Sequence, residues 1–418
     1  MPEQHKYKKI LSPNHWDCLA RKEVDKMEYR FSEQQQMLKQ ALHSLLKKEM
    51  PIEVFSEVVE KKDGFSKDAW KKLAENGWLG VLAKGEWQTL EDVGPLDLMY
   101  LSESVGEKLF PGPYSLVAGF IVPLLSQLKL TNQHQELLNM VISGEKRITT
   151  ALPKLEKSQT KVEFNWPEIN ILNEESDKIH LTGEIKHIQF LQHTEVILVP
   201  FKNNGGRISA VLINIKNDGV NIIPEQSTDL SKPQGTLVLD GVWLNKDDFI
   251  EGTDSNHQEL LNNQLTNYLL CLNGEMIGGA NEVLNRTVNY VKERKQFGVP
   301  VGSFQAVKHM IADLHIAIEK ARSYSVYVAS QNGKSPNETL LNAISSRLFT
   351  TDIYKKVCED AIQLHGGMGF TWEECIHYWY KASMYQQSHM THPAMMTEFI
   401  LQNLLGESEY SKEFQYNQ

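Results

Sequence analysis

The chain has 418 residues, of which 41% are hydrophobic and 23% are charged, and its formal net charge is −10. This length predicts two or three domains, and the composition is typical of a soluble globular protein. The negative charge argues against nucleic-acid binding, and the lack of an apolar run of about 18 residues argues against a membrane span.

The four cysteines are scattered and form no CxxC pair; they are Cys18, Cys271, Cys358 and Cys375. This spacing favours neither a disulfide framework nor a zinc site, and it fits a reducing compartment. Residues 1–30 are polar, mixed in charge and without the apolar core of a secretion signal. We therefore expect a polar extension over residues 1–30, a cytoplasmic protein and no bound metal.

Helical patterns dominate residues 31–146. Apolar residues recur at spacings of three and four from Phe31 to Val59, which predicts one helix with a buried face. A short helix is expected after the capping residue Ser66. Three more helices are predicted over residues 96–108, 114–128 and 132–143. This region is predicted to be an N-terminal helical domain.

The pattern changes to short β-branched runs over residues 147–253. Strands are predicted over residues 178–182, 196–199, 208–213, 220–223 and 236–239. Turn signals, among them Gly183 and Asp240-Gly241, separate these runs. Strands at this spacing predict a small β-sandwich or barrel. Helical patterns return in residues 254–418 and continue to about Leu405.

A basic run and a cluster of helix breakers connect two of the C-terminal helices. Arg294 is expected in the last turn of the first helix, where its planar side chain can bind a phosphate through two hydrogen bonds. Phe297 offers an aromatic face beside it, and Gly298, Pro300 and Gly302 prevent the helix from continuing. An arginine, a ring and exposed amides suit the pyrophosphate of a dinucleotide. An ordinary helical hairpin with a surface arginine would show the same pattern.

Two segments in this part of the chain resemble the acyl-CoA dehydrogenases, flavoproteins that oxidise acyl-CoA thioesters. The sequence ERKQFGVPVGSFQAVKH, at residues 293–309, is similar to one signature of the family, and AIQLHGGMGF, at residues 361–370, is similar to a second. The resemblance implies an α+β fold with an N-terminal helical domain, a middle β-barrel or sandwich and a C-terminal four-helix bundle.

The resemblance also implies FAD as the cofactor, with its ADP half held by a neighbouring subunit. The residues that would contact it are Arg294, Gln296, Phe297, Gln305, Gln363, Gly366 and Gly367. Glycines at such positions let the backbone approach a ligand closely. The family's usual flavin-binding phrase in the β domain is absent, and Ser158 and Thr160 are candidate replacements. His365 lies in the second segment, directly before Gly366, and is expected to be a packed loop histidine.

The implied reaction needs a carboxylate that removes the α-proton of the thioester. Neither position at which family members carry this glutamate has one here, because the first falls in residues 388–392 and the second at about Tyr268. The remaining candidate is Glu275, on an apolar helical segment that resembles the paired bacterial dehydrogenases acting on bulky acyl-CoAs. Three glycines (Gly274, Gly278 and Gly279) thin this helix, so that a ligand or neighbouring backbone can come close. The alternative is that Glu275 pairs with a buried arginine or lysine and is structural.

Three functions follow from these observations. The first is FAD-dependent α,β-dehydrogenation of an acyl-CoA, with Glu275 as the base and an electron-transfer flavoprotein as the electron acceptor. The second is a non-catalytic partner subunit of a hetero-oligomeric acyl-CoA dehydrogenase. The third is a flavin oxidase or monooxygenase on the same fold, because fold does not fix chemistry. The resemblance implies a tetramer, built from one kind of subunit or from two paralogous kinds.

Overall fold

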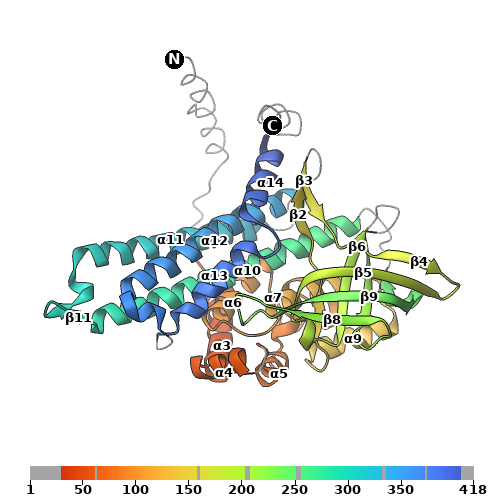
Figure 1. The fold of residues 1–418 in the computed structure, drawn as a ribbon, viewed down its shortest axis with the longest axis horizontal. Helices are drawn as coiled ribbons and strands as arrows, with labels where there is room; N and C mark the ends of the chain where they lie inside the picture. The colour runs from red at the N-terminus through yellow and green to blue at the C-terminus, as the bar shows by residue number, and fades with distance from the viewer. Residues whose placement is uncertain are drawn as a thin grey trace, which may run out of the picture. The chain divides into compact units, whose positions relative to one another are not determined.

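The computed structural model describes residues 30–61, 64–157, 161–202, 208–250, 256–331, 336–371 and 374–405. By its contacts the chain divides into residues 1–36 and Met37–Gln418. The described elements run from helices through strands to a second set of helices, in the predicted order (Figure 1). Apart from Arg30, the extension predicted for residues 1–30 lies outside the described residues.

The N-terminal region is helical, as predicted. Its helices are α3 (Glu33–Glu49), α4 (Ile52–Lys61), α5 (Lys67–Glu75), α6 (Pro95–Glu107), α7 (Tyr114–Leu116), α8 (Val122–Leu125) and α9 (Asn132–Ile142). The Ser66 hydroxyl accepts a hydrogen bond from the Ala69 amide at 3.4 Å, which confirms the predicted cap.

Two of the predicted helices differ from the structure at a proline. The single helix predicted from Phe31 to Val59 is wrong, since α3 ends at Glu49 and α4 begins at Ile52. Pro51 explains the break, because proline lacks an N–H and disfavours the helical conformation in the residue before it. The helix predicted over residues 114–128 ends at Leu125 and contains a π-helical turn at Val117–Ile121. Pro123 cannot donate to the ordinary helical ladder there.

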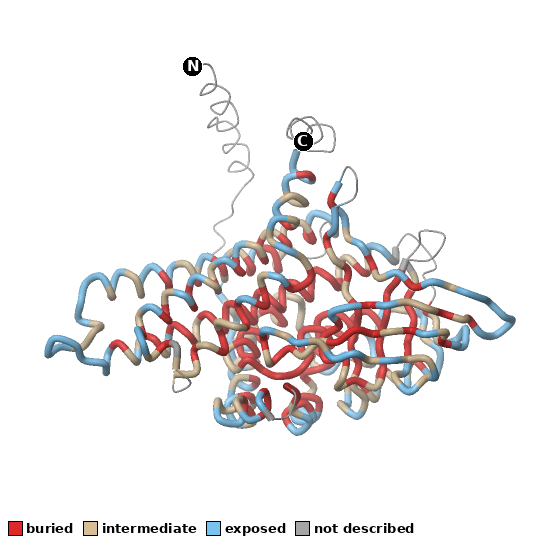
Figure 2. The backbone as a smooth tube through the Cα atoms, viewed as in Figure 1, coloured by how far each residue is buried: buried red, intermediate tan, exposed pale blue. Residues whose placement is uncertain are grey.

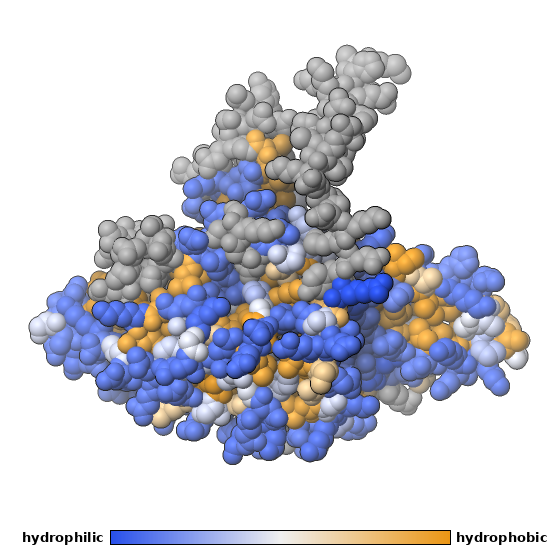
Figure 3. All heavy atoms as spheres, turned by 180° about the vertical axis from the view of Figure 1, so that it is seen from behind, coloured by the Kyte–Doolittle hydropathy of each residue, from blue (hydrophilic) through white to orange (hydrophobic). Residues whose placement is uncertain are grey.

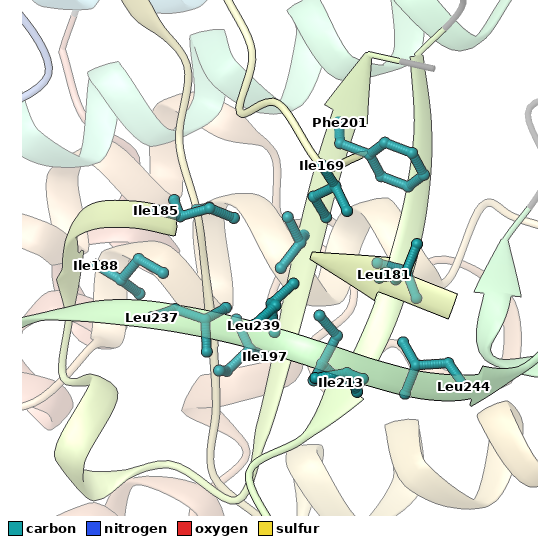
Figure 4. Packing of buried hydrophobic residues seen from close by; sticks show 14 of the residues in the cluster. Ile169, Leu181, Ile185, Ile188, Ile197, Phe201, Ile213, Leu237, Leu239 and Leu244 are labelled. Carbon is teal, nitrogen blue, oxygen red and sulfur yellow. The ribbon is translucent and has the colours of Figure 1, made fainter. Parts of the chain in front are cut away.

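The β region contains two four-stranded sheets, with strand orders β1-β6-β7-β10 and β4-β5-β9-β8, and a β2-β3 hairpin. The strands are β1 (Ile148–Thr150), β2 (Lys154–Lys157), β3 (Val162–Asn165), β4 (Asn170–Glu174), β5 (Lys178–Gln189), β6 (Val196–Lys202), β7 (Ile208–Asn214), β8 (Val220–Glu225), β9 (Gln234–Asn245) and β10 (Phe249–Ile250). Each of the predicted strands lies within one of these. Leu181, Ile197 and Leu239 belong to the buried cluster that joins the two sheets (Figure 4).

The turns predicted at Gly183 and Asp240-Gly241 are wrong. Both sites lie inside long strands, β5 and β9, which pair with each other across a register shift between Leu181 and Gly183. Gly241 has a φ of 64°, a conformation that favours glycine. These glycines therefore mark a β-bulge, which bends a strand without ending it.

The C-terminal region consists of α10 (Asn256–Glu293), α11 (Gln305–Gln331), α12 (Pro336–His365), α13 (Ile376–Ser388) and α14 (Pro393–Leu405). Helix α10 packs against α6, α11 and α12, and its middle stretch is buried (Figure 2). None of the described helices is both long and apolar enough to cross a membrane.

Glycines set the close contact between α10 and α6. A Cβ added at Gly274 would lie 2.1 Å from the Met99 carbonyl oxygen, and one at Gly278 would lie 1.9 Å from that of Glu103. From the other side, a Cβ at Gly106 would lie 1.8 Å from the Glu275 carbonyl oxygen. The space beside these glycines is thus filled by neighbouring backbone rather than left for a ligand.

Candidate active site and cofactor clamp

A cavity of about 350 Å³ lies between the β region and the C-terminal helices. Its walls are polar side chains with a few apolar ones, and they comprise Leu116, Thr150, Leu152, Lys154, residues 186–189, residues 226–228, Gln234, Tyr385 and residues 388–391. Among these described residues there is no aspartate or glutamate. The buried Ser227 hydroxyl has no hydrogen-bond partner among the described residues, so the cavity offers an unused polar group to a ligand.

A hydrogen-bonded cluster forms the helical side of this cavity. The amides of Gln189 and Gln234 donate to the Tyr385 hydroxyl at 2.6 and 3.0 Å. Tyr385 Oη lies 3.0 Å from His389 Nδ1, and Tyr268 Oη lies 2.7 Å from His389 Nε2. The imidazole of His389 is therefore bonded through both nitrogens.

The cluster is electrically neutral at pH 7. Burial, reinforced by the positive charge of Arg347, lowers the pKa of His389 well below its usual value. Burial also raises the pKa values of Tyr268 and Tyr385, which keeps both phenols protonated. Because Tyr385 accepts two amide hydrogens, its own proton is directed to His389 Nδ1. With this orientation the proton of the imidazole lies on Nε2, which faces the Tyr268 hydroxyl at 2.7 Å and has the Gln189 amide nitrogen at 3.4 Å. Both nitrogens are thus in contact with polar groups of the protein.

Arg347 supports this cluster from α12. Its guanidinium is buried and donates to the backbone carbonyls of Gln386 and His389, at 3.0 and 3.3 Å. Within the described residues it forms no ion pair, and burial lowers its pKa to about 10. Arg347 thus fixes the chain at His389, the last position of the cluster.

Glu275 lies outside the walls of the larger cavity. Its carboxylate forms an ion pair with Lys232 Nζ at 3.2 Å and accepts a hydrogen bond from the Ser115 hydroxyl. Both charged side chains are more than nine-tenths buried. Glu275 and Lys232 border a separate space of only about 20 Å³. If Glu275 is a structural residue, it should pair with a buried arginine or lysine. The ion pair with Lys232 has this form.

The residues predicted to clamp a cofactor lie at the far end of the bundle. Arg294 follows α10 directly, Gln296 and Phe297 lie in the loop that leads to α11, and Gln305 begins α11. All four are exposed, and Phe297 is 92% exposed. In the part of the chain that the structure describes, Arg294 forms no ion pair. On the face drawn in Figure 3, apolar patches interrupt the hydrophilic surface at this end of the bundle.

The second signature meets the first at this end. Gln363 is exposed near the end of α12, and Gly366 and Gly367 follow in an exposed 3-10 turn. His365 is buried and stacks on Tyr290 of α10, with ring centroids 4.1 Å apart, and the Tyr290 hydroxyl donates to the His365 carbonyl. The packed histidine predicted at position 365 is confirmed, and burial lowers its pKa to about 4.

Open space surrounds the glycines of this end. A Cβ added at Gly298, Gly366 or Gly367 would meet no atom within 4 Å. The exposed guanidinium, the exposed ring and these uncovered amides suit a pyrophosphate with an attached base. Ser158 and Thr160, the candidate flavin donors of the β domain, lie outside the described residues.

The residues predicted to bind the pyrophosphate lie far from the cavity along the chain. Tyr268, beside the cavity, and Arg294, in the clamp, are 26 positions apart along α10, which corresponds to about 39 Å at 1.5 Å per residue.

Two family models match the chain. "Acyl-CoA dehydrogenase, N-terminal domain" matches residues 32–145, and "Acyl-CoA dehydrogenase, C-terminal domain" matches residues 259–390. The chain belongs to the acyl-CoA dehydrogenase family. The fold predicted from the resemblance is thereby confirmed, as are oxidation at CH–CH bonds and FAD as the family's activity and cofactor.

Individual relatives match either a short stretch of the chain at higher identity or most of the chain at low identity. Acyl-CoA dehydrogenase IpdE2 of Mycobacterium tuberculosis is 41% identical over 112 residues, which are 27% of this chain and 33% of that protein. The match thus spans about a third of that relative's length. The caffeyl-CoA reductase-Etf complex subunit CarC of Acetobacterium woodii is 23% identical over 81% of this chain and 90% of its own. The fold is also similar to the ChsE4-ChsE5 complex of Mycobacterium tuberculosis, with a TM-score of 0.78 and 21% identity over 90% of this chain and 99% of that chain.

Sequence reasoning missed Lys232 and the contact between Tyr268 and His389. Lys232 stands in a loop between proline and serine, where a lysine is ordinarily solvent-exposed. Tyr268 and His389 are 121 positions apart, and nothing in either local pattern indicates their contact. The only signal in the sequence was the absence of a carboxylate at Tyr268 and in residues 388–392.

Proposed function

We propose that this chain is the partner subunit of a hetero-oligomeric acyl-CoA dehydrogenase, which binds the FAD of a neighbouring subunit and supplies no catalytic base of its own. The observation that carries the proposal is the absence of a carboxylate from the described walls of the 350 Å³ cavity. Glu275, the one candidate from the sequence, is paired with Lys232 outside those walls.

The residues at the usual positions of the base support this assignment. Tyr268 and His389 stand where the resemblance places glutamates, and they bond to each other instead. A phenol and a neutral imidazole with both nitrogens occupied accept no proton from a substrate. The cluster with Tyr385 therefore has the properties of a structural wall.

FAD, when bound, supplies the hydride acceptor of the reaction. This chain's own contribution would be the clamp: Arg294, Gln296 and Phe297 would hold the pyrophosphate and adenine end of the cofactor, and Gly366 and Gly367 would let the backbone come close to it. Gln305 and Gln363 would be further hydrogen-bond donors. Because about 39 Å of α10 separates the clamp from the chain's own cavity, the clamp serves the cavity of a neighbour.

The relatives support a mixed assembly. One solved structure is a complex of two chains, ChsE4 and ChsE5, and CarC is named as a subunit of a complex with an Etf. We infer that the neighbour is a paralogous subunit that carries the glutamate, that the substrate is an acyl-CoA, and that an electron-transfer flavoprotein accepts the electrons.

A second candidate is a dehydrogenase that uses Glu275 as its base. It is favoured by the position of Glu275 at the border of the 20 Å³ space between the helices. This mechanism requires Lys232 to leave the carboxylate, which costs the buried ion pair.

The test is co-expression with a paralogous subunit that carries a glutamate. We expect the mixed complex to bind FAD and to reduce it with an acyl-CoA, and Arg294→Ala in this chain to lower the flavin content of that complex. Glu275→Gln in this chain should leave the rate of flavin reduction unchanged, after correction for the folded fraction. Loss of flavin reduction in Glu275→Gln, with flavin retained, would establish the second candidate instead.

A further inference from the structure

We infer that residues 226–233, the segment between β8 and β9, close the inner end of the 350 Å³ cavity and exclude an acyl chain from this subunit. The inference deepens the proposed function, since a subunit without a base needs no pocket for an acyl tail. It assigns to the cavity a compact polar ligand group in place of an apolar one.

The segment has a cavity on each side. Gln226, Ser227 and Thr228 line the larger cavity, whereas Asp229 and Lys232 line the 20 Å³ space between the helices. Tyr385 and Gln386 divide in the same way, with Tyr385 on the larger cavity and Gln386 on the smaller space. A ligand chain that enters the larger cavity therefore meets this segment before it can reach the interior of the helical region.

The segment is held firmly although it is a loop. Asp229, Ser231 and Lys232 are all more than nine-tenths buried, which is unusual for a connection between strands. The backbone amide and hydroxyl of Ser231 both donate to the Asp229 carboxylate, at 2.9 and 2.7 Å. At its end the Pro233 carbonyl accepts a hydrogen bond from the Phe190 amide at 2.7 Å. The Lys232–Glu275 ion pair then ties the segment to α10.

The chemistry behind the segment also excludes an acyl tail. The space of about 20 Å³ has apolar side chains on its border, among them Leu109, Phe110 and Met276, but it also has the charged side chains of Glu275, Lys232 and Asp229. An apolar chain placed there would remove solvent and hydrogen-bond partners from buried charges without replacing them. At Gly106 the backbones of α6 and α10 are in contact, so no ligand passes between the two helices at that point. The small volume and the buried charged groups both oppose an apolar ligand.

The test compares the affinities of acetyl-CoA and octanoyl-CoA for the full-length chain, by calorimetry under anaerobic conditions. We expect wild type to bind the two within about threefold of each other, because each buried methylene would otherwise contribute about fourfold. The variant Lys232→Ala/Glu275→Ala removes both charges together and vacates volume. It should bind octanoyl-CoA about 60-fold tighter than acetyl-CoA, as expected for three buried methylenes.

The matched control is Lys232→Met/Glu275→Met, which removes the same charges and keeps the volume. It should bind the two thioesters as wild type does. Wild type that prefers octanoyl-CoA by tenfold or more would overturn the inference, as would equal gains in the alanine and methionine variants. Bleaching of bound flavin during these titrations would instead refute the proposed function, and the affinity ratio would still report on the segment.

Discussion

Replacing Glu275 by glutamine tests whether this residue is structural. The carboxylate and the Lys232 ammonium lie 3.2 Å apart, and their side chains are 7% and 8% exposed. Coulomb's law with an effective dielectric constant of about 20 gives about 5 kcal/mol of attraction at this distance. Desolvation offsets part of it, and removal of one partner from a buried pair costs about 3–5 kcal/mol. We expect Glu275→Gln to lower the free energy of unfolding by about 3 kcal/mol.

The assay is urea unfolding followed by circular dichroism, with the midpoint and slope compared with wild type. Glu359→Gln is the matched control, because Glu359 pairs with Lys355 at 3.8 Å with its side chain 47% exposed, and its loss should cost less than about 1 kcal/mol. The variant Lys232→Met/Glu275→Met should recover most of the lost stability, since replacing a buried pair by apolar side chains is often neutral. If the Glu275→Gln variant unfolds with the same urea midpoint and slope as wild type, the reasoning is refuted.

Three further results are expected. Arg294→Ala should weaken FAD binding by the assembled complex about 10- to 100-fold, as expected for the loss of a charged hydrogen bond. Lys292→Ala, a change at a neighbouring exposed lysine, should leave FAD binding unchanged. Equal losses of bound flavin in the two variants, measured by flavin fluorescence, would contradict the clamp. The depressed pKa of His389 means that the unfolded chain binds a proton more readily than the folded one, so the contribution of His389 to stability should be fully present above about pH 6.5 and fall by up to about 1.4 kcal/mol per pH unit below it. Burial also lowers the pKa values of His134, His365 and His377. His389→Gln should therefore make the profile shallower, without abolishing it, in thermal melts from pH 5 to 8, and an unchanged slope would refute the reasoning. Gly278→Ala should destabilise the chain by about 3 kcal/mol, because the added methyl group would collide with the backbone of α6. Gly367→Ala should unfold as wild type does, because a Cβ there would meet no atom within 4 Å. Equal unfolding midpoints for the two variants would disprove the contact with α6.

The sequence predicted the architecture well because its signals are local. Runs of β-branched residues located part of each strand from β5 to β9, mostly its first residues, and the two signature segments identified the family and its fold. The errors fell where a local signal has two structural outcomes. Asp240-Gly241 reads as a turn but forms a bulge within β9, because pairing with β5 continues on both sides.

The candidate site was predicted only in part, for a physical reason. Exposed positions such as Arg294 and Gly366 follow from their motifs. The state of Glu275 depends on Lys232, which is 43 positions away and reaches α10 from a loop of the β region. A buried ion pair between two domains leaves no periodicity in either segment, so the sequence offered both interpretations of Glu275 and could not choose between them.

The same limit applies to the cavity wall. The absence of a carboxylate at Tyr268 and at residues 388–392 was visible in the sequence. What replaces it was not, since Tyr268, Tyr385 and His389 meet only when α10 and α13 are packed beside β5. The absence of an expected residue is thus easier to detect from the sequence than the contacts that the residues present form instead.

The most direct test of the partner-subunit assignment is an absorption spectrum of the isolated chain, reconstituted with FAD and titrated without air with a series of acyl-CoA thioesters. The account predicts that no thioester bleaches the flavin, and that bleaching appears when the paralogous subunit with its glutamate is added. Bleaching by the isolated chain would contradict the account and establish that this subunit carries its own base.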